Sequence, residues 1–424
     1  MKRIFSALAL LTIAALLAGA QGVSAPSGQA TTPAGTQAVT SPVASPAATP
    51  AAAAAGPAEG KHYLVTSTLG AERSAKLLTR LEGLFSLFAR VFRFDEGHLQ
   101  GKLIVREFAS KADFDAYLLK SAGETRGDFV YIHYPSALKR ELLLYSKPEP
   151  EFSASLAHQA FVQYLKAFIQ DPPLWLRDGF AVCFETVRWK EAGAESSFTE
   201  NLAWLETVKA LKSKNTLIKL DRLFEANPED ARAAVEVFYP EAWAFVSFLV
   251  NDMEGDYSRL LWETIATLGP TSSLADNQGA FARRVGAWYG LDALEKAFGE
   301  YIDSRKTYPE LVALGTEQYN KKEYDRADTN FAEAARLEPN AFVVPYYQGL
   351  IAYSKSQYQQ ADAFYKQALA LGCDKPTVNY ALGLNSIARG LNDEGAAFLS
   401  LASTANPDRY KARVDDILKR LGKN

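Results

Sequence analysis

The stretch SLAHQAFVQYL, residues 155–165, contains the one histidine that stands in a recognisable metal-binding pattern. A zinc peptidase helix places a second histidine four residues after the first, so that both imidazoles face one ion, and a glutamate directly after the first as general base. Here Gln159 takes the glutamate position and Val162 the second histidine position. An amide has no useful basicity and valine has no lone pair, so His158 is the only donor left and no catalytic set is intact.

A second stretch, PPLWLRDGFAVCFE at 172–185, follows this helix. With SLAHQAFVQYL and VFYPEAWAFVSFLV (237–250) it resembles the MA-like (gluzincin-type) peptidases of bacteria, over nearly all of 60–307. In that family a Pro-x-Trp-Leu-x-Glu-Gly-x-Ala segment supplies the third zinc ligand. The resemblance implies a zincin-like fold, with His158 at the first ligand position and Asp178, one methylene shorter than glutamate, at the third.

The same resemblance implies a substrate cleft beside the ligand positions. We expect Trp175 and Tyr239 to line it. His133 falls on a predicted hairpin strand, and such hairpins often border the cleft. Glu185 could replace the missing ligand, although a charge on the helix surface is the commoner role at such a position.

Three interpretations of this region remain open. An inactive peptidase-like domain keeps the fold and the cleft without zinc, because one imidazole and one carboxylate leave the ion half-coordinated. An active zinc metallopeptidase requires replacement ligands and a replacement base. A helical domain with accidental similarity holds His158 as an ordinary hydrogen-bonded side chain. We favour the first and expect no cofactor; zinc belongs only to the second.

The last third of the chain repeats every 34 residues, in copies at 308–341, 342–375 and 376–409. The first copy resembles the tetratricopeptide repeat, a pair of antiparallel helices. Small residues allow the two helices to approach, large ones fill the gap to the next helix, and proline ends the second helix. The signature positions are Gly315, Ala327, Phe331, Ala334, Pro339, Gly349, Ala361, Tyr365, Ala368, Gly383, Ala402 and Pro407.

This second resemblance implies an all-α solenoid over 308–424 that ends in a capping helix, RYKARVDDILKRLG. Stacked helix pairs form a concave groove, so we expect the module to bind a protein or peptide and to act as a scaffold in an envelope-associated complex. Under the active-peptidase interpretation, the repeats recruit protein substrates instead.

Residues 60–307 mix strands with helices, which predicts an α+β fold. Strands are expected at 62–68 (HYLVTST) and 101–108 (GKLIVREF), with a helix between them that carries an apolar stripe. FVYIHYP and RELLLYS are expected to pair as a hairpin. After Glu149 the pattern is almost wholly helical up to Lys306.

The N-terminal segment reads as an export signal and a tether. Residues 1–20 combine a basic start, an apolar run and small residues at a cleavage point, which is typical of a signal peptide and predicts a periplasmic or secreted protein without a membrane span after cleavage. Residues 21–59 are rich in Ala, Pro, Ser and Thr and predict a disordered linker. The formal net charge is −3, and no basic block predicts nucleic-acid binding.

Overall fold

The structure, a computed structural model, describes residues 56–133, 140–189, 196–198, 200–252 and 255–423. The folded part of the chain consists of two compact units, and the boundary between them lies between Arg305 and Lys306. The predicted signal peptide and all but the end of the predicted linker lie outside the described residues. The folded part begins earlier than expected, because Ala58–Glu59 forms a strand, β1, that pairs with the next one.

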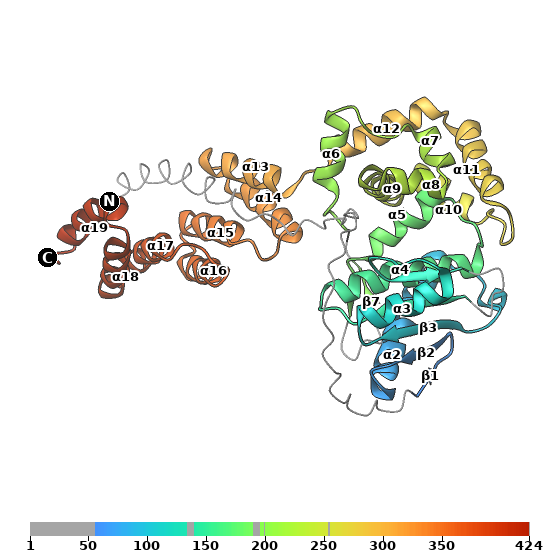
Figure 1. Cartoon of the computed structure of the whole chain (residues 1–424). Helices are drawn as coiled ribbons and strands as arrows, with labels where there is room; N and C mark the ends of the chain where they lie inside the picture. Colours follow the sequence, from blue (N-terminus) through green and yellow to red (C-terminus); the bar gives the residue numbers. More distant parts are fainter. Residues whose placement is uncertain (1–55, 134–139, 190–195, 199, 253–254, 424) are drawn as a thin grey trace, which may run out of the picture. The chain divides into compact units, whose positions relative to one another are not determined.

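The unit at 56–305 contains a five-stranded sheet in the order β1-β2-β3-β5-β4 (Figure 1). Its strands are β2 Tyr63–Ser67, β3 Leu103–Phe108, β4 Val130–Ile132 and β5 Glu141–Tyr145, besides β1. The expected strands and the antiparallel pairing of β4 with β5 are confirmed. The parallel pairing of β2, β3 and β5 in the middle of the sheet was not predicted. A small sheet followed by helices confirms the α+β layout.

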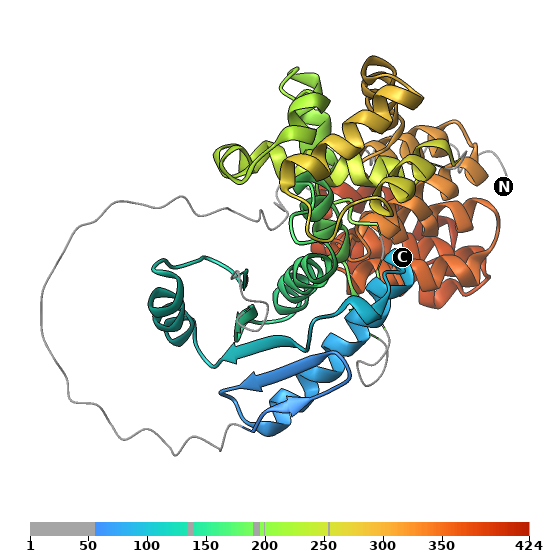
Figure 2. The same cartoon turned by 90° about the vertical axis from the view of Figure 1, so that its right-hand side faces the viewer.

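Both faces of β5 are covered, which explains its continuous apolar run. Leu142 and Leu144 belong to the core formed with helices α2 (Ala71–Phe92) and α4 (Glu151–Phe168). Leu143 points to the opposite face, where helix α3 (Lys111–Ala122) contributes Phe114 and Leu118. Figure 2 shows α2 running alongside the blue strands at the start of the sheet. Helix α4, which carries His158, is therefore fixed by the sheet on one side.

Helices make up most of the rest of this unit and surround α9, Val235–Val250, which Figure 1 shows end-on. The others are α5 Leu174–Phe184, α6 Leu205–Ser213, α7 Leu220–Glu225, α8 Pro228–Ala233, α10 Asp256–Ile265, α11 Leu274–Trp288 and α12 Leu291–Ser304. The almost wholly helical pattern expected after Glu149 is confirmed, with one small exception. Two short strands, β6 Arg188–Trp189 and β7 Ser196–Ser197, pair antiparallel, and buried Ser196 donates to the Gly83 carbonyl in α2.

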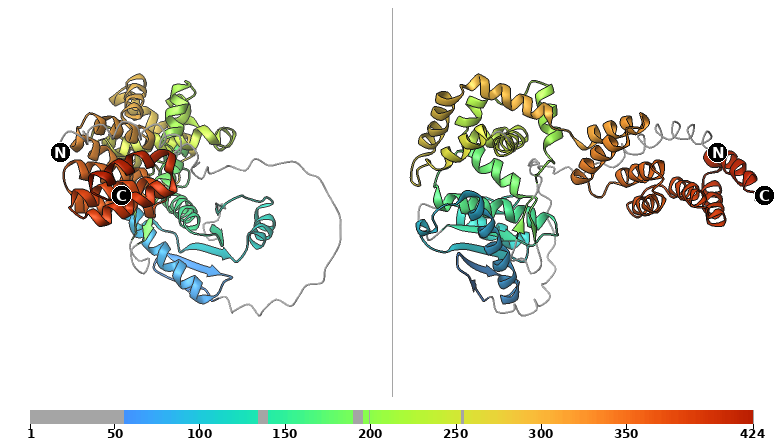
Figure 3. Two further views of the ribbon diagram at one scale, coloured as in Figure 1. Left: turned by 90° about the vertical axis from the view of Figure 1, so that its left-hand side faces the viewer. Right: turned by 180° about the vertical axis from the view of Figure 1, so that it is seen from behind.

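The unit after Arg305 consists of helices that follow one another side by side in chain order (Figure 3, orange to red). They are α13 Tyr308–Asn320, α14 Tyr324–Leu337, α15 Val343–Ser354, α16 Tyr358–Ala370, α17 Lys375–Ala388, α18 Asn392–Ala405 and α19 Pro407–Arg420. Helices α13 to α18 form three pairs that coincide with the three copies of the sequence period.

Each pair repeats one close contact. A Cβ atom on Gly315 would lie 2.9 Å from the ring of Phe331, one on Gly349 2.5 Å from Tyr365, and one on Gly383 2.7 Å from Leu399. Distances below 3 Å leave no room for a side chain, so these glycines allow the two helices of each pair to approach. The alanines in register, Ala327, Ala334, Ala361, Ala368 and Ala402, are fully buried.

The ends of the pairs also follow the period. Pro339 and Pro407 each stand two residues after the last residue of a helix, α14 and α18 respectively. Pro407 is also the first residue of α19, which buries Tyr410 and Val414 and leaves a charged face outside. Among the described residues, no helix combines the length and apolar composition needed to cross a membrane.

Candidate functional site

His158 lies on α4 and its nearest ionisable partner is Glu185. The Nδ1 atom of His158 is 2.8 Å from Oε1 of Glu185, which is the C-cap residue of α5. The imidazole is 16 % exposed and the carboxylate 28 % exposed, so the pair is half-buried. Asn201 donates from Nδ2 to the Val182 carbonyl at 2.9 Å and lies 3.4 Å from Oε2 of Glu185. Glu185 is thus more than a surface charge: it orients the histidine.

The other two positions of the helix motif are structural. The backbone N–H of Tyr131, on edge strand β4, donates to Oε1 of Gln159 at 3.3 Å. The glutamine side chain therefore ties α4 to the sheet edge. Val162 is 9 % exposed and belongs to the main apolar core. Neither residue offers a base or a metal ligand.

Asp178 is held by its own neighbour in the sequence. Its side chain is almost fully buried, and Arg177 donates from Nε to Oδ1 at 2.7 Å and from Nη2 to Oδ2 at 2.9 Å. Both carboxylate oxygens are therefore occupied by a bidentate guanidinium pair. Sequence reasoning missed this role of Arg177, because adjacent residues on a helix do not normally face each other.

Tyr239, on α9, is brought close to Asp178. The charge of Asp178, followed by burial, raises the pKa of the Tyr239 phenol to about 12, and Glu185 adds to the shift. Its hydroxyl therefore stays protonated at neutral pH. His158 thus contacts Glu185 at the end of α5, and Asp178 on the same helix influences Tyr239 on α9, the helix against which α5 packs.

Trp175 does not fit the expected role in a cleft. Its side chain is 1 % exposed and packs among Phe224, Phe245 and Phe281, with ring centroids 4.7 to 6.0 Å away. The Trp-Leu-Arg-Asp-Gly segment therefore uses its tryptophan to anchor α5 in the helical core. The reason is burial: a side chain enclosed by three aromatic rings is not available to a ligand.

His133 also lies apart from His158. Burial, followed by the charges of Lys166 and Arg140, lowers the pKa of the His133 imidazole to about 4, so the ring is neutral at pH 7. Lys166 is two turns further along α4 than His158, roughly 12 Å along the helix axis. The hairpin does border α4, but it brings His133 to the far end of that helix.

The donor set does not fit zinc. A catalytic zinc site uses three protein ligands and a water molecule. In the described part of the chain, no group of three His, Cys, Asp or Glu side chains is arranged to hold a metal ion. His158 has one carboxylate partner, and the carboxylate of Asp178 is committed to Arg177. The arrangement can hold charges and orient side chains, and it supports no metal-dependent step.

No protein-family model matches this chain, and no curated protein matches it.

A further buried acid lies on α9, beside this region. Glu241 is fully buried; its Oε2 accepts the backbone N–H of Ile218 at 2.8 Å, and its Oε1 has no partner among the described residues. Burial raises the pKa of Glu241 to about 8 against the opposing effect of the Ile218 bond. The acid is therefore largely protonated in the folded protein at neutral pH.

Substitution of Glu241 by glutamine is expected to change how stability depends on pH. Between pH 5 and 8 the folded protein keeps a proton that the unfolded chain releases, so the wild type loses up to ~1.4 kcal/mol per pH unit through this group as pH rises. E241Q should lack that slope and be about 2 kcal/mol more stable at pH 8.5, after the cost of a buried unpaired amide. Urea unfolding at pH 5 and pH 8.5 measures the difference; parallel pH profiles for both proteins would contradict it.

Proposed function

We propose that this chain is an exported pseudo-peptidase joined to a tetratricopeptide module, and that it works as a protein-binding scaffold in an envelope-associated complex. The peptidase-like part is an MA-like, zincin-like domain that has lost its zinc chemistry. The repeats supply the surface for a protein or peptide partner.

The observation that carries the loss of zinc chemistry is the Arg177–Asp178 pair. A cation placed at the third ligand position must displace a guanidinium that already makes two charge-assisted hydrogen bonds of 2.7 and 2.9 Å. Gln159 bonds to Tyr131 and Val162 is packed in the core, so the two remaining motif positions serve the fold. The residues that stand at the catalytic positions are thus engaged in structural contacts.

The likeness to peptidases rests on how these elements are arranged. Edge strand β4 is tied to α4 by the Tyr131–Gln159 bond, and α5 packs on both α4 and α9. A helix with a histidine beside a sheet edge, followed by a helix with a carboxylate, is the order that the family resemblance implies. The order supports the proposed ancestry, and function is argued from the residues in the site.

The binding role is supported by the three helix pairs. The same glycine-to-large-residue contact recurs at Gly315, Gly349 and Gly383, and the alanines in register are buried. Each pair contacts mainly its neighbours, which is the property that lets repeat arrays present an extended surface to a ligand.

One observation favours a second candidate, an active metallopeptidase with replacement ligands. Glu185 reaches within 2.8 Å of His158, so a carboxylate does stand beside the imidazole. Two donors still fall short of the three that zinc requires.

A capture experiment tests the scaffold proposal. Tagged mature protein is expected to retain a specific partner from an envelope extract of its source cells, and a chain that ends at Arg305 is expected to lose it. The full-length variant Gly286→Ala, at an exposed helical position of the 56–305 unit where a Cβ meets nothing within 4 Å, serves as the handling control. Recovery of the same partner by the shortened chain would show that the repeats are not the binding surface.

A further inference from the structure

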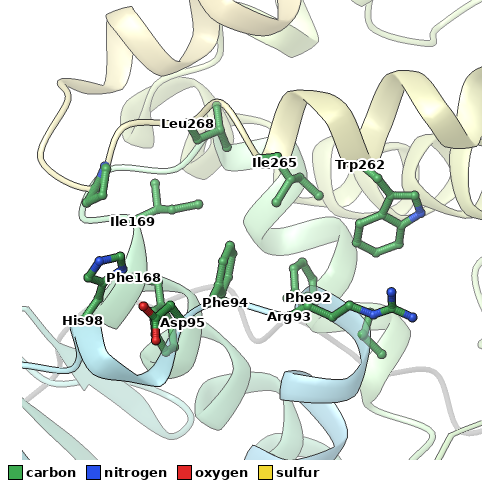
Figure 4. Close-up of a pocket in the computed structure, with 13 residues that line it drawn as sticks. Phe92, Arg93, Phe94, Asp95, His98, Phe168, Ile169, Trp262, Ile265 and Leu268 are labelled. Atoms are coloured by element: carbon green, nitrogen blue, oxygen red, sulfur yellow. The ribbon is translucent and has the colours of Figure 1, made fainter.

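A cavity of about 860 Å³ opens in the 56–305 unit, away from His158. The ends of three helices border it: α2 contributes Phe92, α4 contributes Phe168, and α10 contributes Trp262 and Ile265. Phe94 and Leu268 complete most of its apolar lining. Figure 4 shows Arg93 beside Trp262 at one end, and His98 with Asp95 at the other. Cavities of 300–1,000 Å³ with this kind of lining are typical of small-molecule sites.

The polar groups at the mouth of this cavity differ in whether other residues engage them. Arg93 is exposed, and no hydrogen bond or ion pair engages its guanidinium among the described residues. Its backbone φ of 55° places it in the left-handed region at the end of α2, where the chain turns away from the helix. Asp95 instead accepts the backbone N–H of Gly97 at 2.9 Å and so caps the short turn Glu96–His98. The mouth of the large cavity therefore carries one charge of each sign.

A second, smaller pocket of about 100 Å³ adjoins the cavity. The two share His98, Phe168 and Pro270 as lining residues. The small pocket is lined by the cationic side chains of Lys102, Arg140 and Lys166, and its lining includes no Asp or Glu. Its size suits a carboxylate or phosphate group, and three cations around such a volume favour an anion.

Lys166 is the best placed of these cations. Its side chain is 13 % exposed, and its carboxylate partner Asp171 lies 3.6 Å away and is 42 % exposed. The Nζ atom of Lys102 donates to the backbone carbonyls of Gly60 and Lys61 and lies 3.4 Å from Glu59, which is 66 % exposed. Water weakens both attractions because both acids face solvent. Burial, followed by the charge of Arg177, lowers the pKa of Lys166, and Asp171 acts in the opposite direction.

A buried amide at the same pocket also lacks a partner. Gln163 is 1 % exposed and donates from Nε2 to the Ile104 carbonyl at 2.9 Å, while its Oε1 is buried without a partner among the described residues. A buried acceptor without a donor is costly. A bound water that donates one hydrogen bond to this oxygen and another to an anion would satisfy it.

We propose that the two cavities form one site for an amphiphilic anion: an acyl chain lies in the large cavity and its carboxylate or phosphate lies among Lys102, Arg140 and Lys166. Burial of an alkyl chain gains roughly 25 cal/mol per Å² of apolar surface, which the aromatic lining provides. The head-group end is fixed by His98, Phe168 and Pro270, the residues that both pockets share. This site is independent of the proposed scaffold function.

Calorimetric titration of the full mature chain tests the site with two surfactants of equal chain length below their micelle concentrations. Dodecanoate is expected to bind at least ~10-fold more tightly than dodecyltrimethylammonium, since only the first presents an anion to the lysines. Lys166→Met is expected to weaken dodecanoate binding ~10-fold. Ile265→Trp, which fills the apolar cavity, is expected to weaken it as well. Lys296→Met, an exposed lysine on α12, is the matched control and should bind as the wild type does.

The source of the anion is distinguished by a second arm with vesicles that contain phosphatidylglycerol. Binding of free dodecanoate that depends on Lys166 assigns a soluble fatty acid. Binding to the vesicles that depends on Lys166, where neither free surfactant binds, assigns a membrane lipid. Equal and measurable affinity for both surfactants, full dodecanoate binding by K166M, or no binding to either dodecanoate or the vesicles would overturn the proposal. If K166M does not fold, I265W decides, and undiminished binding by I265W overturns it too.

Discussion

Replacement of Gly179 by alanine is expected to destabilise the 56–305 unit by about 3 kcal/mol. A Cβ atom at this position would lie 2.4 Å from the Ala242 carbonyl oxygen and 2.6 Å from Cγ2 of Val246, both on α9. The first obstacle is backbone, which moves only if α5 and α9 separate, and overpacked cores lose 1–3 kcal/mol or more. Chemical unfolding monitored by circular dichroism gives the free energy.

A matched control exists in the same unit. Gly286 is an exposed glycine on α11, and a Cβ there would meet nothing within 4 Å. Gly286→Ala is expected to stabilise the unit by ~0.5–1 kcal/mol, because alanine is the better helix former. The two substitutions should change the free energy of unfolding in opposite directions. Equal changes would mean that α5 and α9 do not approach as closely as the structure has them.

This result bears on how the Trp-Leu-Arg-Asp-Gly segment is interpreted. Its tryptophan anchors α5 in an aromatic cluster, and its glycine lets α9 approach. Both residues serve packing, and the arginine neutralises the aspartate. The whole segment is therefore explained by the fold, without a metal.

Local patterns in the sequence were enough to predict the elements that depend on residues close together in the chain. The alternation in 62–68 predicted β2, and the apolar stripe after it predicted α2, because both depend on periods of two and 3.6 residues. The 34-residue period predicted helix pairs in register, since each pair contacts its own neighbours in sequence. The placing of His158, Asp178 and Tyr239 around one cleft came from the family resemblance and stays a prediction.

Contacts between distant segments could not be predicted in this way. The parallel pairing of β2, β3 and β5 joins strands separated by a helix, and the sequence period does not record the order of strands. The family resemblance assigned Trp175 to a cleft, whereas the aromatic rings that surround it come from residues 49 to 106 positions further along the chain. The cavity beside Trp262 is formed by three helix ends, and no local pattern indicates it.

The wild-type protein is expected to carry no stoichiometric zinc and to show no chelator-sensitive cleavage of a general peptide substrate. Elemental analysis and a fluorogenic peptide assay measure both. One zinc per chain with cleavage that a chelator abolishes would establish the active-peptidase alternative instead. Asp178 gives a physical reason for the expected absence of zinc, because Arg177 competes with a metal ion for both of its carboxylate oxygens.

Restoring the helix motif should therefore not be enough to restore zinc. Gln159→Glu with Val162→His supplies two imidazoles four residues apart and the general base, yet Asp178 stays paired. Adding Arg177→Gln releases the third ligand and is expected to raise zinc affinity by ~100-fold over the double variant, the upper range for changes beside a metal site. Competition with a chromophoric chelator measures this, and R177Q alone, which lacks the second imidazole, is the control. Equal zinc affinity in the double and triple variants would show that the guanidinium does not block the site, and that the missing histidine and glutamate are the whole cause of the loss.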